Sequence, residues 1–199
     1  MISLPSLLTP SSLLYRENLA PAAQALWEEC QEICAEDRWA RVEEIAQKAR
    51  DLQRTERDWI GYAVILLRLG DLCRRVGKLG PAQEFCEQAR DIFHRYQCVS
   101  EQCHNEAIAA YALGLVNQQL GSERKAQGCY EQALRLFKRA EKHWIAAGDT
   151  KLAKRCHQVS LWIKKLIEHV IYVRSHGKLI ASSHSVCVCP WPIISQEDC

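Results

Sequence analysis

Three groups of cysteine and histidine residues in this chain have side chains that bind transition metals or act as nucleophiles. Cys30 and Cys34 lie four residues apart, so a helix would place both thiols on one face. The second group is Cys98, Cys103 and His104, and the third comprises His176, His184, Cys187, Cys189 and Cys199. No group shows the paired ligand spacing of a structural zinc site. We therefore expect no metal and no cofactor.

The sequence also lacks the motifs of common enzymes. A phosphate-binding G-x-x-x-x-G-K-[ST] loop, a G-x-S-x-G nucleophile elbow and an H-E-x-x-H metal motif are all absent. Cysteines that fall within helical patterns are expected to pack as small apolar side chains and to stay reduced in the cytosol. These are Cys30, Cys34, Cys73, Cys86, Cys129 and Cys156. We expect a protein without catalytic activity.

Composition favours a soluble, folded and cytoplasmic chain. Apolar residues make up 48% and charged residues 25%, which argues against general disorder. The N-terminus has no basic residue before Arg16 and is interrupted by prolines, unlike a secretory signal. No segment reaches the ~18 uninterrupted apolar residues of a membrane span. We therefore expect no membrane association.

Charge is distributed unevenly along the chain. Residues 124–178 carry 13 basic and four acidic side chains, although the net charge of the whole chain is only +2. Such a basic segment can bind phosphates, and Trp144 and Trp162 lie within it. The same cations also interleave with apolar residues at helical spacing, which is typical of a solvated helix face. We do not favour nucleic acid as the partner.

Most of the chain has the apolar spacing of amphipathic helices, with apolar residues recurring every three or four positions. Short breaks follow Gly77, Gly121 and Gly148, where Ser122 can cap one following helix and Asp149 or Thr150 another. We expect about seven helices, at residues 22–36, 38–54, 57–76, 79–97, 101–120, 123–147 and 150–174. Because the connections are short, neighbouring helices should pack antiparallel.

Small residues recur at a fixed spacing. Gly70 and Gly114 are 44 residues apart, and so are Ala82 and Ala126. The segments LGDLCRRVGKLGPAQEFCEQA and LGLVNQQLGSERKAQGCYEQA contain them. Small side chains at these positions would let paired helices approach closely, whereas larger ones would hold them apart.

This pattern resembles the tetratricopeptide repeat (TPR), whose common form is about 34 residues long; the units here would be extended to about 42–44. The resemblance implies an all-α, TPR-like solenoid of antiparallel helix pairs with a C-terminal capping helix. It covers residues 21–174. A flexible leader would occupy residues 1–20, and a flexible or partly extended cysteine-rich tail residues 175–199.

The resemblance also implies a function as a scaffold that binds a peptide or helix of a partner protein in a concave groove. Matching the family's groove positions to this chain gives the anchors Trp27, Gln31, Arg74, Arg75, Tyr111, Gln118 and Gln119. The alternative is a regulatory or nucleic-acid-associated module that uses the basic helices of residues 124–178. Self-association is compatible with either reading.

Overall fold

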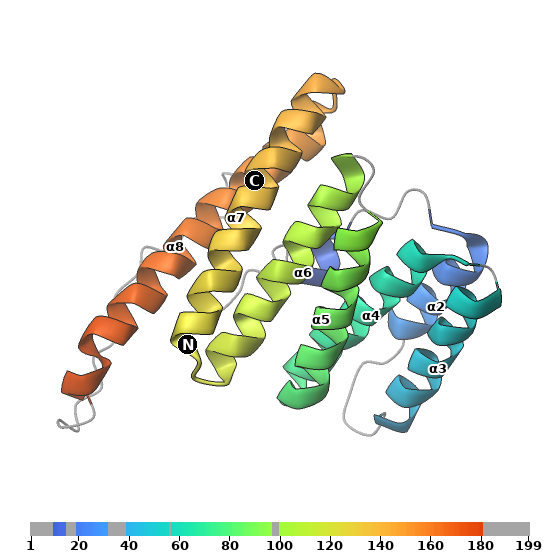
Figure 1. Ribbon diagram of the computed structural model, residues 1–199, viewed down its shortest axis with the longest axis horizontal. Coiled ribbons are helices and arrows are strands. Elements are labelled where there is room, and N and C mark those ends of the chain that lie inside the picture. Colours follow the sequence, from blue (N-terminus) through green and yellow to red (C-terminus); the bar gives the residue numbers. More distant parts are fainter. Residues whose placement is uncertain (1–9, 15–18, 32–38, 56, 97–99, 181–199) are drawn as a thin grey trace.

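The computed structural model describes residues 10–14, 19–31, 39–55, 57–96 and 100–180. These residues form helices and contain no strand, which confirms the all-α prediction (Figure 1). The helices are α1 (Pro10–Leu13), α2 (Pro21–Gln31), α3 (Trp39–Thr55), α4 (Trp59–Arg75), α5 (Leu79–Arg95), α6 (Ser100–Gln119), α7 (Glu123–Ala146) and α8 (Thr150–Ile180).

Helix boundaries differ from the sequence prediction mainly at three places. Helix α2 ends at Gln31, and the rest of the predicted helix to residue 36 lies outside the described residues. Helix α8 continues to Ile180 rather than ending at residue 174. Helix α1 falls within the segment predicted as a flexible leader, and no periodicity in the sequence indicates it.

The helices from α2 onward form two layers. Successive helices pack against each other from α2 to α8, and α4 also contacts α2 and α6. Figure 1 shows α5 in front of α4 and α7 in front of α8, with α6 between these two pairs. The arrangement is a solenoid-like stack of antiparallel neighbours, as expected.

Three turns in this stack have the same geometry. Gly77, Gly121 and Gly148 adopt positive φ angles of 77°, 68° and 80°, a conformation that glycine adopts without steric cost. After each glycine, the next amide donates to a carbonyl five residues back: Lys78 to Cys73 (2.9 Å), Ser122 to Asn117 (2.8 Å) and Asp149 to Trp144 (2.9 Å). This is the Schellman ending of a helix, and it reverses the chain tightly enough to pair the flanking helices.

Two aspartates cap the helices that follow a loop. Asp58 Oδ1 accepts a hydrogen bond from the Gly61 amide at 2.8 Å, and Asp149 Oδ1 accepts one from the Leu152 amide at 2.9 Å. The expected capping role of Ser122 is wrong. Ser122 occupies the N-cap position of α7, but its side chain makes no capping hydrogen bond there.

Glycines mark the closest approach between paired helices. A side chain at Gly70 of α4 would begin 2.6 Å from Cys86 Sγ and 3.3 Å from the Ala82 carbonyl oxygen of α5. A side chain at Gly114 of α6 would overlap the ring of Tyr130 in α7. Cys86 and Tyr130 each follow the corresponding glycine by 16 residues. The two helix pairs therefore meet at equivalent places.

The same equivalence extends along the second helix of each pair. Ala82, Ala89 and Phe93 in α5 are fully buried, and so are Ala126, Ala133 and Phe137 in α7, at a spacing of 44 residues. The predicted structural role of small residues at Ala82 and Ala126 is thus confirmed by their burial. The 44-residue repeat in the sequence thus corresponds to equivalent buried positions in α5 and α7.

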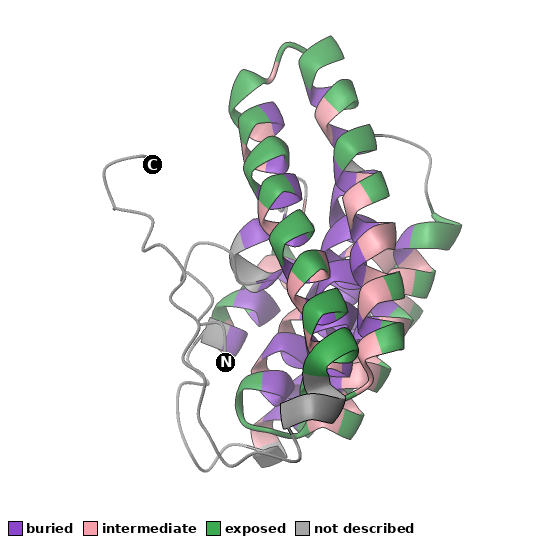
Figure 2. Cartoon of the chain, turned by 90° about the vertical axis from the view of Figure 1, so that its left-hand side faces the viewer, coloured by how far each residue is buried: buried purple, intermediate pink, exposed green. Residues whose placement is uncertain are grey.

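Helix α6 is the centre of the core. Every residue from Cys103 to Asn117 is buried, and its apolar residues are spread around the helix rather than gathered in one stripe. At the end of the stack, α8 buries one face on α7, including Val159, Ile163, Leu166 and Val170, as expected of a capping helix. Figure 2, which views the stack from this end, shows exposed residues along the outer turns and buried ones inside.

Substitution of Gly114 tests the packing of α6 on α7. Gly114→Ala places a methyl group against the Tyr130 ring, so we expect a loss of about 1–3 kcal/mol in the free energy of unfolding, and a larger loss for Gly114→Leu. The control is Gly128→Ala, at an exposed glycine inside α7 with open space around it. It should stabilise the chain by about 0.5–1 kcal/mol. Urea unfolding measures both. Equal stability of Gly114→Leu and the wild type would contradict the assigned contact.

Candidate functional site

Two arginines and an aspartate form an ion-pair cluster at the C-terminal end of α4. Arg74 Nη2 donates to Asp71 Oδ1 at 2.7 Å, and Arg75 Nη2 donates to Asp71 Oδ2 at 3.1 Å. The Asp71 side chain is fully buried, the Arg74 side chain is 9% exposed and the Arg75 side chain is 44% exposed. Of the two predicted arginine anchors, only Arg75 offers its charge to a partner in this conformation.

The equivalent end of α6 carries a second polar cluster. The Tyr130 hydroxyl of α7 donates to Gln118 Oε1 at 2.7 Å, and the Tyr130 ring lies 6.2 Å from that of Tyr111. Tyr111 is fully buried, and this burial raises the pKa of its hydroxyl. Gln118 is half-buried and Gln119 is exposed. The two glutamines thus lie at the surface, whereas Tyr111 belongs to the core.

The predicted anchors on α2 lie in a different setting. Trp27 is 3% exposed, and the Arg68 guanidinium carbon of α4 lies 5.4 Å from the centroid of its ring. This cation–π contact ties α2 to α4. The side chain of Gln31 lies outside the described residues. Trp27 acts here as a packing residue between helices.

Helix α1 covers part of the face on which the predicted anchors lie. His104, Ile108 and Tyr111 share one face of α6, because they are spaced by four and three residues. His104 Nε2 bonds the Leu13 carbonyl oxygen at 2.9 Å, and α1 packs on α4 and α6. Leu13 and Leu14 are 1% and 5% exposed. We call this face of α4 and α6 the groove face.

Exposure on the groove face changes along the helices. Its residues near the middle of α4 and α6, Leu67, Ile108 and Tyr111, are fully buried. Near the C-terminal ends of the same helices, Arg75 and Gln119 are exposed. The structure therefore brings Arg74, Arg75, Tyr111 and Gln118 onto one face of neighbouring helices, but only its polar end is open to a partner.

The hydrogen-bond partner of Nε2 and the burial of the ring together favour one neutral tautomer of His104. The Leu13 carbonyl can only accept, so Nε2 carries the proton. Nδ1 is then an acceptor, 3.3 Å from Cys156 Sγ of α8, and the thiol donates to it. Burial is the main cause that lowers the pKa of His104 to about 4, opposed by the Leu13 carbonyl and assisted by the charge of Arg155. The neutral imidazole joins α1, α6 and α8.

A cysteine beside a histidine can form a catalytic thiolate–imidazolium pair, but the surroundings here oppose it. Burial raises the pKa of Cys156 to about 12, and the pKa of His104 is lowered. Both groups are therefore neutral near pH 7, and the thiol is not activated as a nucleophile. Burial also raises the pKa of Cys30 and Cys73 to about 12, so these thiols pack as apolar side chains.

No group of three or more His, Cys, Asp and Glu side chains is placed to hold a metal ion among the described residues. Within the second sequence group, Cys103 and His104 are buried in α6, and Cys98 lies outside the described residues. Cys34 and residues 181–199, with most of the cysteine-rich tail, also lie outside them.

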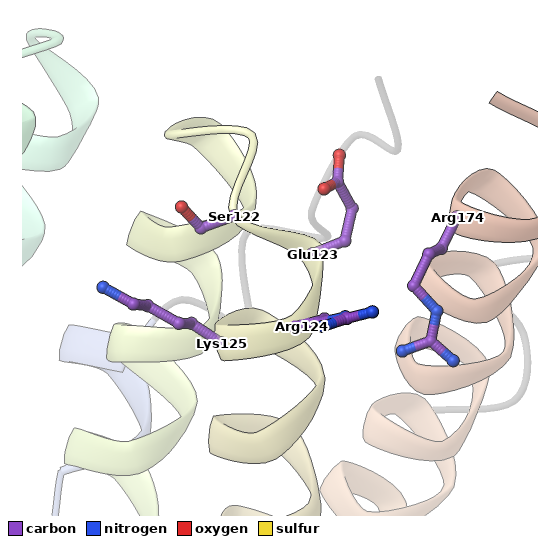
Figure 3. Close-up of a pocket in the computed structure, with 5 residues that line it drawn as sticks. All are labelled: Ser122, Glu123, Arg124, Lys125 and Arg174. Atoms are coloured by element: carbon purple, nitrogen blue, oxygen red, sulfur yellow. The ribbon is translucent and has the colours of Figure 1, made fainter. Parts of the chain in front are cut away.

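A surface pocket of about 360 Å³ lies where α7 begins and α8 approaches its end. It is lined by Ser122, Glu123, Arg124, Lys125 and Arg174 (Figure 3). In the figure, Arg124 and Arg174 project into the space between the two helices, whereas Lys125 extends away from it. Arg174 Nη1 donates to Gln127 Oε1 at 2.8 Å. The pocket is basic and holds no pair of groups suited to acid–base or nucleophilic chemistry.

Comparisons with protein-family models, curated proteins and solved structures find no match to this chain. None of the described helices combines the length and hydropathy that a membrane span needs. The functional assignment therefore depends on the geometry of the groove face.

Sequence reasoning missed the residues that close the groove face. The sequence suggests His104 only as a metal ligand, and Leu13 and Leu14 lie in the predicted leader. The pair of leucines after Ser11 and Ser12 is an apolar signal, but four helical residues are too few to show a period. A buried contact between residues 91 positions apart leaves no local pattern.

The two arginines of α4 should differ in their contribution to stability. Arg74→Met leaves the buried Asp71 carboxylate with one partner fewer, so we expect a loss of about 3 kcal/mol in the free energy of unfolding. Arg75→Met removes a half-exposed ion pair and should cost less than about 1 kcal/mol. Chemical denaturation of both variants measures the difference. Equal losses would show that Arg74 is not the interior partner of Asp71.

Stability should also depend on pH through His104. Because its pKa falls from 6.5 to about 4 on folding, the unfolded chain binds the proton more readily between these values. The free energy of unfolding should therefore drop by about 2 kcal/mol from pH 7 to pH 5 through this group.

The matched variant for this test is His104→Gln, which stays neutral and keeps a donor for the Leu13 carbonyl. Urea unfolding at both pH values should show a smaller drop for the variant than for the wild type. Since burial also lowers the pKa of His169, the difference between the two chains is the relevant quantity. An identical drop in both chains would contradict the burial of His104.

Proposed function

We propose that this chain is a non-catalytic protein–protein interaction scaffold of the tetratricopeptide-repeat type, which binds a peptide or helix of a partner along the groove face. The observation that carries the proposal is the equivalent packing of α4 on α5 and of α6 on α7. Gly70 against Cys86 and Gly114 against Tyr130 repeat at a spacing of 44 residues. Stacked pairs of this kind expose a continuous face of their first helices.

The polar end of the groove face supplies groups that suit a peptide. Arg75 presents a half-exposed guanidinium, and Gln118 and Gln119 offer amide donors and acceptors. A backbone segment has both N–H and C=O groups to satisfy, so side-chain amides are well matched to it. In this proposal Arg75, Gln118 and Gln119 bind the partner directly. Trp27, Arg74 and Tyr111 pack within the scaffold.

A cytoplasmic location belongs to the same proposal. Cys30, Cys73, Cys86, Cys103 and Cys156 are buried free thiols. Such thiols persist where the cell keeps cysteines reduced.

The basic segment is the less favoured alternative. Several of its cations are exposed, among them Lys138, Lys142 and Lys165. Stacking of bases needs accessible aromatic rings as well. Trp144 is only 6% exposed and packs beside His104, so it is not available as a stacking platform. The burial of Trp144 thus removes one stacking ring from this segment, and Tyr172 of α8, which is 48% exposed, is the accessible ring that remains.

Substitution at the open end of the groove face tests the proposal. We expect Arg75→Glu/Gln119→Glu to lose most proteins that the wild-type chain retains in affinity capture with quantitative mass spectrometry. The matched control, Gln88→Glu/Arg95→Glu, makes the same changes of charge at exposed positions of α5. It should retain the wild-type set. Retention of the same proteins by the groove-face variant would refute this assignment.

A further inference from the structure

Helix α1 differs from the rest of the stack in what holds it in place. A helix of four residues is too short to form on its own, so it depends on its contacts. Those contacts are the buried side chains of Leu13 and Leu14 and the hydrogen bond from His104 Nε2 to the Leu13 carbonyl. Among the described helices it packs on α4 and α6.

The helices of each pair pack against each other through contacts that do not involve α1. The equivalent contacts at Gly70 and Gly114 lie between α4 and α5 and between α6 and α7. The buried phenylalanines Phe93 and Phe137 also belong to those pairs. Since α1 lies on the groove face instead, its removal leaves every repeated helix–helix contact intact.

Two opposing terms of comparable size act on this segment. Burial of two leucines favours the docked state, and loss of conformational freedom in five residues opposes it. A small element with such a balance is expected to open locally, more readily than the core helices do. The docked segment can therefore exchange with a competing ligand.

We propose that residues 10–14 are an intramolecular ligand of the groove face, and that they occupy the place of a leucine-bearing helical segment of the partner protein. This inference rests on the proposed function and names its ligand class and regulation. The ligand presents two adjacent leucines to α4 and α6 and a free carbonyl to His104, as Leu13 and Leu14 do. Its flanking residues reach Arg75 and Gln119 at the polar end of the groove face.

Because α1 belongs to the same chain as the groove face, it competes strongly with a partner for that face. A segment linked by a short chain acts at an effective concentration in the millimolar range, about that of short flexible linkers. A partner therefore needs contacts beyond the two leucines, which the open polar end supplies. While the segment is docked, the apparent affinity of the partner is reduced by the fraction of chains that are open.

The test uses a labelled synthetic peptide that copies residues 7–16 (LLTPSSLLYR) and the full-length chain, with binding followed by the line widths of the peptide's NMR signals. Leu13→Asp/Leu14→Asp should free the groove face and lower the dissociation constant of the peptide about ten-fold or more. The control chain, Leu161→Asp/Ile171→Asp, changes two exposed apolar residues of α8 and should bind the peptide as weakly as the wild type does. A peptide with aspartate in place of the leucines that correspond to Leu13 and Leu14 should bind none of the chains.

Equal peptide binding by the wild-type and Leu13→Asp/Leu14→Asp chains overturns the inference. Circular dichroism checks that each variant is folded. If this variant does not fold, Leu13→Ala/Leu14→Ala replaces it, and its failure to fold also overturns the inference, because a displaceable ligand cannot be required for the fold. A wild-type dimer in light scattering, produced by exchange of α1 between two copies, overturns it too. Loss of the inference in any of these ways leaves the capture result for Arg75 and Gln119 unaffected, so the two proposals fail separately.

Discussion

The stack depends on the closeness with which paired helices approach each other. At Gly114 a bare backbone lies against the Tyr130 ring, and at Gly70 it lies against Cys86. This closeness brings α6 within reach of neighbours on every side, so that its residues from Cys103 to Asn117 are all buried. The identical glycine turns after α4 and α6 set the direction in which each second helix returns. The packing contacts and the turn geometry thus favour the same alignment of the two helices in each pair.

Several helices together cover the groove face. The second helices α5 and α7 pack on α4 and α6, and α7 also reaches the groove face, where Tyr111 lies beside Tyr130 and His104 beside Trp144. The short α1 covers the part near His104, and the ion pairs of Asp71 make the far end polar. An apolar middle with a polar rim is typical of surfaces that bind other proteins.

Much of this fold could be predicted from the sequence, because its determinants are local. Helix periodicity, the glycine at each turn and the spacing of small residues all act within one helix pair. The contact of α1 with His104 joins residues 91 positions apart, and no local pattern encodes it. The candidate site was predicted less well for the same reason: position on a helix face indicated Trp27, Arg74 and Tyr111, but their burial depends on neighbours that the face does not specify. Arg75, Gln118 and Gln119 lie at helix ends, where fewer neighbours compete for the surface.

The central claim is that residues 10–14 lie on the groove face, with Leu13 against His104. Nuclear Overhauser effects between the imidazole protons of His104 and the backbone protons of Leu13 and Leu14 test this contact directly in the full-length chain. The account predicts that these effects are observed near pH 7, with the proton of the imidazole on Nε2. Their absence, together with rapid exchange of the His104 Nε2 proton with solvent, would contradict it.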